Sequence, residues 1–188
     1  LYRDGATVDL TPSGYQLDSP DFLTPGGQPL SDHYPLLTNF SWTVKPNFMM
    51  SDLFGGPHGS PFNDSNQLSS TSVANQFILR AGSRVDQIGV RLENGVTLTH
   101  GGNGGTHRVL DLNAGEYVRE IKLCSGKKDG HTRIFYAELR TNLNRTLSGG
   151  SQTSNTVTYT APSGWRITGF YGNSGNELDK VGVVYTKI

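Results

Sequence analysis

Cysteine and net charge are the two things this sequence almost lacks. Cys124 is the single cysteine, and 16 acidic residues cancel 16 basic ones. One cysteine excludes a disulfide within the chain, and we expect Cys124 to be a small core residue rather than a nucleophile. Zero net charge, with only 17% of residues charged, gives no sign of electrostatic capture of nucleic acid or an anionic membrane. We therefore predict no nucleic-acid partner.

Long apolar runs are missing as well. No stretch approaches the roughly 20 apolar residues of a membrane-spanning helix, so we predict no membrane insertion. The first residues do not form a signal peptide, and a start at Leu1 indicates a processed or shortened product. Sequons at Asn39, Asn63 and Asn144 favour secretion over the cytoplasm, although they leave the compartment open.

Helix-forming segments rich in Ala, Glu, Lys and Leu are absent too. The chain instead has 24 glycines and abundant Thr, Ser, Asn, Val and Tyr. This composition is typical of an all-β fold with many tight turns. We expect an N-terminal extension over residues 1–50 and a single β domain over residues 51–188, with the intervening Lys45–Ser51 as a linker or strand entry.

The extension carries one motif, Ser31-Asp32-His33-Tyr34-Pro35, in a loop before an apolar strand. It resembles the closing motif of the endonuclease/exonuclease/phosphatase superfamily, where the His matching His33 deprotonates water and the Asp matching Asp32 supports the metal site. The metal-binding Glu, the Asn pair and the second catalytic His of that family are missing here. Since 46 residues cannot form its two-sheet sandwich, we interpret the segment as a remnant that serves as a structural extension.

The β domain contains a repeated glycine–aspartate segment. Residues 81–90 align with residues 174–183, and both read Gly-x-x-apolar-Asp-x-apolar-Gly-Val. A degenerate third copy is predicted at residues 114–123, where Arg119 takes the Asp position. Backbone N–H groups and a carboxylate held in one loop suit two neighbouring hydroxyls, as on a sugar ring. The alternative for a single copy is an Asp that only satisfies its own turn.

A second series of glycine-rich loops alternates with the first. The loops are Phe54–Gly59, His100–Gly105 and Leu147–Ser151, and each precedes a short polar strand. Repetition of both series in alternating order predicts threefold pseudo-symmetry in an antiparallel fold.

Over about residues 53–188 the sequence resembles a jacalin-related lectin. The landmarks that carry the resemblance, in order, are Phe54-Gly55-Gly56, Pro61-Phe62-Asn63-Asp64, His100–Gly105, Gly115–Val118, Leu139–Asn142, Gly169–Gly175 and Leu178–Val183. The resemblance implies an all-β fold, the β-prism I of three four-stranded Greek-key sheets around a pseudo-threefold axis. It also implies sugar binding where a GxxxD loop faces a Gly-Gly loop.

The resemblance places two sugar sites, as in the banana-lectin branch of the family. Site one comprises Gly175, Asn176, Glu177, Leu178 and Asp179 facing Gly55 and Gly56. Site two comprises Gly82, Ser83, Arg84, Val85 and Asp86 facing Gly101 and Gly102. The third corner would set Arg119 opposite Gly149 and Gly150, and we predict that it is silent because it lacks an acceptor.

Specificity is also implied by the resemblance. Galactose-specific members carry a new α-amino group in the site, whereas the Gly55-Gly56 loop here is internal. This favours mannose- or glucose-type glycans. Pro57 and His58 interrupt the first glycine loop and could narrow site one. Arg84 could reach an acidic glycan, but we favour a solvated side chain.

The sequence therefore predicts a non-enzymatic lectin with mannose-containing glycans as partners, no cofactor, and possible assembly into homodimers or higher oligomers. The histidines are spaced too irregularly to predict a metal site. Two alternatives are a fragment of a lectin-targeted phosphodiesterase, nuclease- or sphingomyelinase-like, and a sugar-blind β-prism that serves as an interaction domain.

Overall fold

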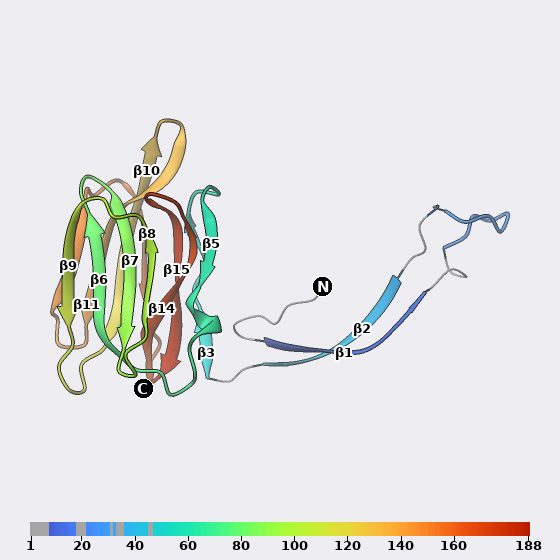
Figure 1. Ribbon diagram of the computed structural model, residues 1–188, viewed down its shortest axis with the longest axis horizontal. Coiled ribbons are helices and arrows are strands. Elements are labelled where there is room, and N and C mark those ends of the chain that lie inside the picture. Colours follow the sequence, from blue (N-terminus) through green and yellow to red (C-terminus); the bar gives the residue numbers. More distant parts are fainter. Residues whose placement is uncertain (1–7, 18–21, 31, 33–35, 45–46) are drawn as a thin grey trace. The chain divides into compact units, whose positions relative to one another are not determined.

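The computed structural model describes residues 8–17, 22–30, 32, 36–44 and 47–188. The chain divides into two units, residues 1–46 and residues 47–188 (Figure 1). In the first unit β1 (Val8–Leu17) pairs antiparallel with β2 (Leu36–Val44). A short bridge joins Leu23 and Pro29.

The β1–β2 hairpin places most of its apolar side chains on one face, with Leu37 on the other. Directly opposed residues share a face of a sheet, and the register pairs Leu10 with Trp42 and Pro12 with Phe40. Trp42 is nonetheless 65% exposed, and no residue of this unit that the structure describes is buried. The hairpin therefore supplies no core of its own, as expected for two strands alone.

The second unit is built from antiparallel strands in three sets. The first sheet has the order β8 (Thr97–Gly101), β7 (Val85–Leu92), β6 (Ala74–Ala81) and β9 (Thr106–Asp111). The second has the order β12 (Thr146–Gly150), β11 (His131–Thr141), β10 (Val118–Lys128) and β13 (Asn155–Thr160). In both, the fourth strand returns beside the first, which is the Greek-key arrangement.

The third set brings together both ends of the unit. Its centre is the hairpin of β14 (Trp165–Ser174) and β15 (Leu178–Lys187). Along β15 run β3 (Phe48–Met50) and β4 (Phe54–Gly55), and along β14 runs β5 (Ser60–Asn63), which leads into the 3₁₀ turn η1 (Asp64–Asn66). The predicted all-β fold of three Greek-key sheets is confirmed. The segment expected as a linker or strand entry contains β3, which pairs with β15 in the third sheet.

Residues that alternate along the strands form one core between the sheets. Phe77 and Phe170 are fully buried and meet edge to face at its centre, with ring centroids 6.0 Å apart. Cys124 is buried, as expected. Leu178 and Val85, the apolar residues of the two GxxxD loops, have no exposed surface. They anchor both loops in the core and leave only their backbones for a ligand.

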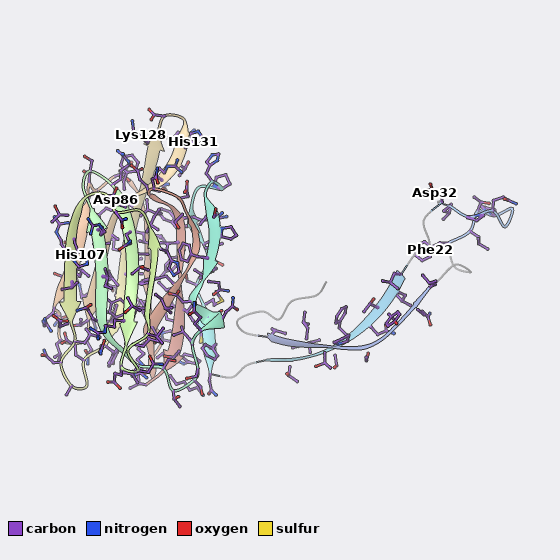
Figure 2. The ribbon with its side chains drawn as sticks, viewed as in Figure 1. Phe22, Asp32, Asp86, His107, Lys128 and His131 are labelled. Atoms are coloured by element: carbon purple, nitrogen blue, oxygen red, sulfur yellow. The ribbon has the colours of Figure 1, made fainter. Side chains whose placement is uncertain are left out.

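The hairpin loops β6–β7, β10–β11 and β14–β15 lie at the same end of this unit. Figure 2 shows Asp86 at this end, below the projecting tip that carries Lys128 and His131. This end therefore contains both predicted sugar sites, as well as a third hairpin that reaches beyond them.

Candidate carbohydrate-binding site

The two predicted corners share one backbone arrangement. In site one the Gly56 N–H donates to the Asp179 carbonyl at 2.8 Å, and in site two the Gly102 N–H donates to the Asp86 carbonyl at 2.9 Å. Each Gly-Gly loop therefore faces its GxxxD loop, the arrangement that the resemblance implied.

The first glycine of each pair is required by the backbone. Gly55 and Gly101 have φ of 126° and 116°. A Cβ at Gly101 would lie 2.0 Å from the Asp86 carbonyl oxygen, and one at Gly55 would lie 2.3 Å from that of Asp179. A side chain at either position would separate the strands, so these glycines bring the glycine loop close to the carboxylate.

The third corner corrects the predicted repeat. Here the Ser151 N–H donates to the Phe135 carbonyl at 2.8 Å, and Gly150 has φ of 95°. Phe135, not Arg119, therefore takes the Asp position. Arg119 follows the first residue of β10, and its guanidinium bonds Asn144 in the turn after β11.

The misalignment has a simple cause. The predicted third copy began at Gly115, in the connection before β10, whereas the equivalent hairpin turn is Asp129-Gly130. The prediction that this corner lacks an acceptor still follows, since Phe135 carries no carboxylate.

In site two the Asp86 carboxylate is partly exposed beside glycines. Its Oδ2 accepts from the Gly82 N–H at 3.1 Å. A Cβ at Gly104 would lie 2.4 Å from Oδ1, and one at Gly105 would lie 2.5 Å from Oδ2. Among the described residues, Asp86 has no ion pair.

Donors accompany this acceptor. The backbone N–H groups of Ser83 and Arg84 make no hydrogen bond within the part of the chain that the structure describes. Site two thus offers an open carboxylate and free N–H groups side by side, the set that two neighbouring hydroxyls need.

Arg80 supports the glycine loop of site two, a role that the sequence did not indicate. Its guanidinium donates to the carbonyls of Asn103 at 2.8 Å, Gly104 at 3.0 Å and Gly105 at 3.4 Å. A loop rich in glycine has many accessible conformations, so three bonds from one fork hold it in a single shape.

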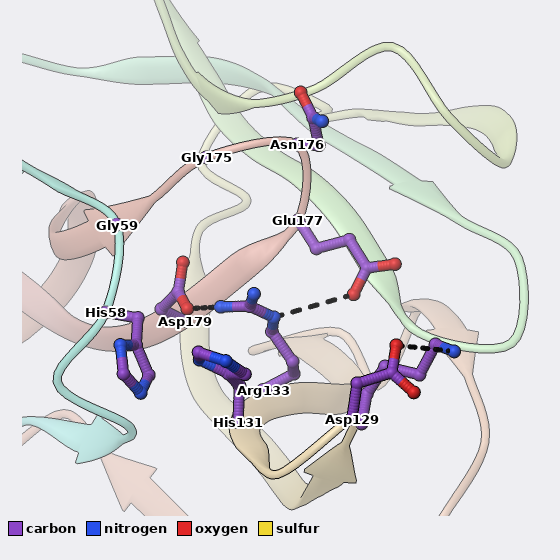
Figure 3. A pocket seen from close by; sticks show the side chains of 10 residues that line it. His58, Gly59, Asp129, His131, Arg133, Gly175, Asn176, Glu177 and Asp179 are labelled. Carbon is purple, nitrogen blue, oxygen red and sulfur yellow. Dashed lines mark ion pairs between the residues drawn. The ribbon is translucent and has the colours of Figure 1, made fainter.

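In site one the Asp179 carboxylate is covered. It is 1% exposed and forms an ion pair with Arg133 of β11 (Figure 3). Gly59 here approaches Asp179 as Gly105 approaches Asp86. The preceding residue is His58 where site two has Gly104, so the predicted narrowing by His58 adds an imidazole beside the carboxylate.

The β10–β11 hairpin forms a wall of site one. A Cβ at Gly56 would lie 2.5 Å from the Thr132 carbonyl oxygen, so the hairpin packs directly on the first glycine loop. The ring centroids of His131 and His58 lie 4.1 Å apart. A cavity of about 530 Å³ opens between the hairpin and the GxxxD loop. Its lining residues are His58, Gly59, Lys128, Asp129, His131, Arg133, Gly175, Asn176, Glu177 and Asp179.

Arg84 links the two sites instead of extending into solvent. Its guanidinium donates to both oxygens of Glu177, at 2.8 and 2.5 Å, and lies 5.8 Å from the centroid of the Phe135 ring. The bond from Arg84 lowers the pKa of the Glu177 carboxyl, and Glu177 in turn raises the pKa of Arg84. The expectation of a solvated Arg84 is wrong because this pair is only about one-fifth exposed.

Two other predictions concern chemistry outside the sugar sites. His33 of the nuclease-like motif lies outside the described residues. Among residues that are described, no group of three His, Cys, Asp or Glu side chains could hold a metal ion, and no helix is long and apolar enough to cross a membrane.

Known proteins with similar sequences identify the family of the β domain. The model of the jacalin-like lectin domain matches residues 51–184. A sequence relative, the secreted RxLR effector protein 19 of Plasmopara viticola, is 28% identical over 162 residues, covering 81% of this chain and 88% of the relative. Horcolin of Hordeum vulgare is 33% identical over 86 residues, covering 46% of this chain and 59% of horcolin.

Solved structures agree on the fold. A variant of Malaysian banana lectin superposes with a TM-score of 0.67 at 23% identity, covering 75% of this chain and 99% of that one. A mannose-specific jacalin-related lectin from Morus nigra, solved with mannose, gives a TM-score of 0.64 at 22% identity, covering 77% and 97%. With its family model matched over most of its length, the chain belongs to the jacalin-like lectin family.

Proposed function

We propose that this chain is a non-enzymatic, metal-independent lectin with two sugar sites, and that site two binds mannose- or glucose-type glycans. The observation that carries the proposal is the open Asp86 carboxylate beside the free N–H groups of Ser83 and Arg84. One carboxylate accepts from two adjacent hydroxyls while the N–H groups donate to the same oxygens. Jacalin-related relatives described as mannose-binding support the same sugar class.

The site should bind a monosaccharide weakly. A few hydrogen bonds exchanged with water correspond to a dissociation constant in the millimolar range, or about 4 kcal/mol. Two sites per chain, and assembly into homo-oligomers, would raise the affinity for branched glycans through multivalency. The secreted relative supports an extracellular location, where such glycans occur.

A glycan array tests the proposal. Wild type should bind mannose-containing glycans, and the Asp86→Ala/Asp179→Ala variant should lose this binding while it retains the circular dichroism of a folded β protein. Undiminished mannose binding by the double variant would overturn the site assignment. Binding of no glycan by the wild type would instead indicate a sugar-blind interaction domain.

The phosphodiesterase alternative has its own assay. Wild type and His33→Ala would be incubated with a phosphodiester substrate and Mg²⁺. We expect no turnover by either protein, whereas hydrolysis abolished by His33→Ala would contradict a non-enzymatic role.

A further inference from the structure

We propose that site one selects a saccharide that carries a carboxylate, such as a hexuronic acid, and that Arg133 is its specificity-determining residue. The proposal rests on the proposed lectin function, but it separates the two sites by ligand class. It starts from a difference in access: Asp179 is 1% exposed, whereas Asp86 is partly open.

A buried carboxylate cannot accept from sugar hydroxyls as Asp86 can. Arg133 covers Asp179 and neutralises its charge, and its Nε lies 3.9 Å from a Glu177 oxygen (Figure 3). The Glu177 carboxylate itself accepts hydrogen bonds from Nε and Nη2 of Arg84. The carboxylates of Asp179 and Glu177 are therefore both already paired with arginines.

Donors remain on the cavity side. A guanidinium has five N–H hydrogens, and the contacts with Asp179 and Glu177 use only some of them. The Arg133 side chain is 24% exposed and lines the cavity. Its planar fork matches a carboxylate better than a neutral hydroxyl pair, and hydrogen bonds between charged partners are stronger.

The surrounding groups supply further hydrogen-bond donors. His58 and His131 are exposed at the cavity, and an imidazole can donate to an anion. Lys128 pairs with Asp129 at 2.9 Å, and the lining holds three carboxylates against two cations, so selection depends on directed N–H donors and not on net positive charge. The backbone N–H groups of Asn176 and Glu177, which make no hydrogen bond among the described residues, remain for ring hydroxyls.

The cavity also has room for a sugar ring. Its volume of about 530 Å³ falls within the usual range for small-molecule sites. The β10–β11 hairpin supplies the side of the cavity with the donors of Arg133 and His131, and the GxxxD loop supplies the side with free N–H groups. A hexuronate can present its carboxylate to Arg133 and its hydroxyls to the loop in one orientation.

Calorimetric titration with matched ligands tests the proposal. Methyl α-glucuronoside and methyl α-glucoside differ only in a carboxylate in place of a hydroxymethyl group. In the Asp86→Asn variant, where site two is disabled, we expect the glucuronoside to bind at least about tenfold more tightly than the glucoside. Equal affinity for the two sugars would overturn the proposal.

The decisive substitution is Arg133→Gln. It should weaken glucuronoside binding about tenfold or more and leave binding of methyl α-mannoside at site two unchanged. Retained glucuronoside affinity would overturn the role of Arg133. If this variant fails to fold because Asp179 loses its partner, His58→Ala/His131→Ala, which removes both donors, supplies a second test, with an expected loss of about threefold and a contradiction if affinity is unchanged.

Two controls separate this result from neighbouring explanations. Competition by inorganic sulfate as effective as that by the glucuronoside would reveal a general anion site and overturn the assignment to a sugar. Failure of the proposed lectin function has a different signature, since mannoside binding would then be absent from the wild type or insensitive to Asp86→Asn.

Discussion

Sites one and two have the same backbone and different chemistry. In both, the second glycine of the Gly-Gly loop donates its N–H to the backbone carbonyl of the loop aspartate. Gly56 donates to Asp179 and Gly102 donates to Asp86. Yet one carboxylate is buried under an arginine and the other is partly open. The loop signature thus determines where the carboxylate sits, while side chains from neighbouring loops determine whether a ligand can reach it.

One residue position in the glycine loop contributes much of this difference. Site two has Gly104 beside the Asp86 carboxylate, and site one has His58 at the equivalent place before Gly59. The second contribution comes from another sheet, because Arg133 belongs to β11. Access to each acceptor is therefore controlled from outside the GxxxD loop.

The largest expected effect comes from making site two resemble site one. A Cβ at position 104 would lie 2.4 Å from Asp86 Oδ1. In Gly104→His the Asp86 carboxylate must therefore move away from its present position. We expect mannoside affinity at site two to fall about 100-fold, or about 2.7 kcal/mol. Isothermal titration with methyl α-mannoside measures the loss.

The matched control is Asn103→His, which adds the same imidazole at an exposed neighbouring position. It should change the affinity less than about threefold. Equal losses in both variants would show that the loop is merely disturbed, and would remove the argument that Gly104 keeps the acceptor open.

A smaller effect is expected from Arg80→Ala. Removal of three bonds to the carbonyls of Asn103, Gly104 and Gly105 frees the glycine loop, so binding must then reorder it. We expect mannoside affinity to fall about three- to tenfold, with glucuronoside binding at site one unchanged. Arg91→Ala, an exposed arginine of β7, should have no effect on either ligand.

The smallest effect concerns the link between the sites. Arg84 lowers the folded-state pKa of the Glu177 carboxyl. Its stabilising contribution is therefore present above the unfolded pKa, near 4.3, and is lost as pH falls through the lowered folded value. Arg84→Gln should reduce the free energy of unfolding at pH 7 by at most about 1 kcal/mol.

Urea unfolding at pH 7, 5 and 3 checks this expectation. The difference between wild type and Arg84→Gln should shrink as the pH falls through the lowered pKa of Glu177, because the carboxylate then loses the charge that Arg84 pairs with. A difference that stays constant, or grows, at low pH would contradict an ionic link between the sites.

The comparison also shows what the sequence could predict. Local patterns predicted an antiparallel all-β fold with threefold pseudo-symmetry, through the two GxxxD copies and the alternating glycine loops, and the resemblance to jacalin-related lectins supplied the three Greek-key sheets. Gly55 and Gly101 have the positive φ that glycine allows. The placement of Asp179 and Asp86 opposite the Gly-Gly loops followed from the resemblance and not from the patterns alone.

Contacts between sheets were not predictable from local patterns. Arg133 meets Asp179, and Arg84 meets Glu177 from a position 93 residues away. No periodicity within either segment indicates such a pair. The third hairpin did leave a signal, since Asp129-Gly130 between two strand-like runs is a typical turn dipeptide. Because this hairpin has no GxxxD pattern, the glycine–aspartate repeat gave no sign of it.

The β10–β11 hairpin has a consequence for how such lectins diversify. Since Phe135 stands where the other two corners have an aspartate, the corner of this hairpin has no carboxylate that a substitution along the tip could remove. The tip nevertheless lines the cavity of the adjacent corner through Lys128, His131 and Arg133. If site one binds as proposed, a corner without an acceptor sets the glycan preference of its neighbour, and exposed tip residues such as Lys128 and His131 are the positions where that preference would change.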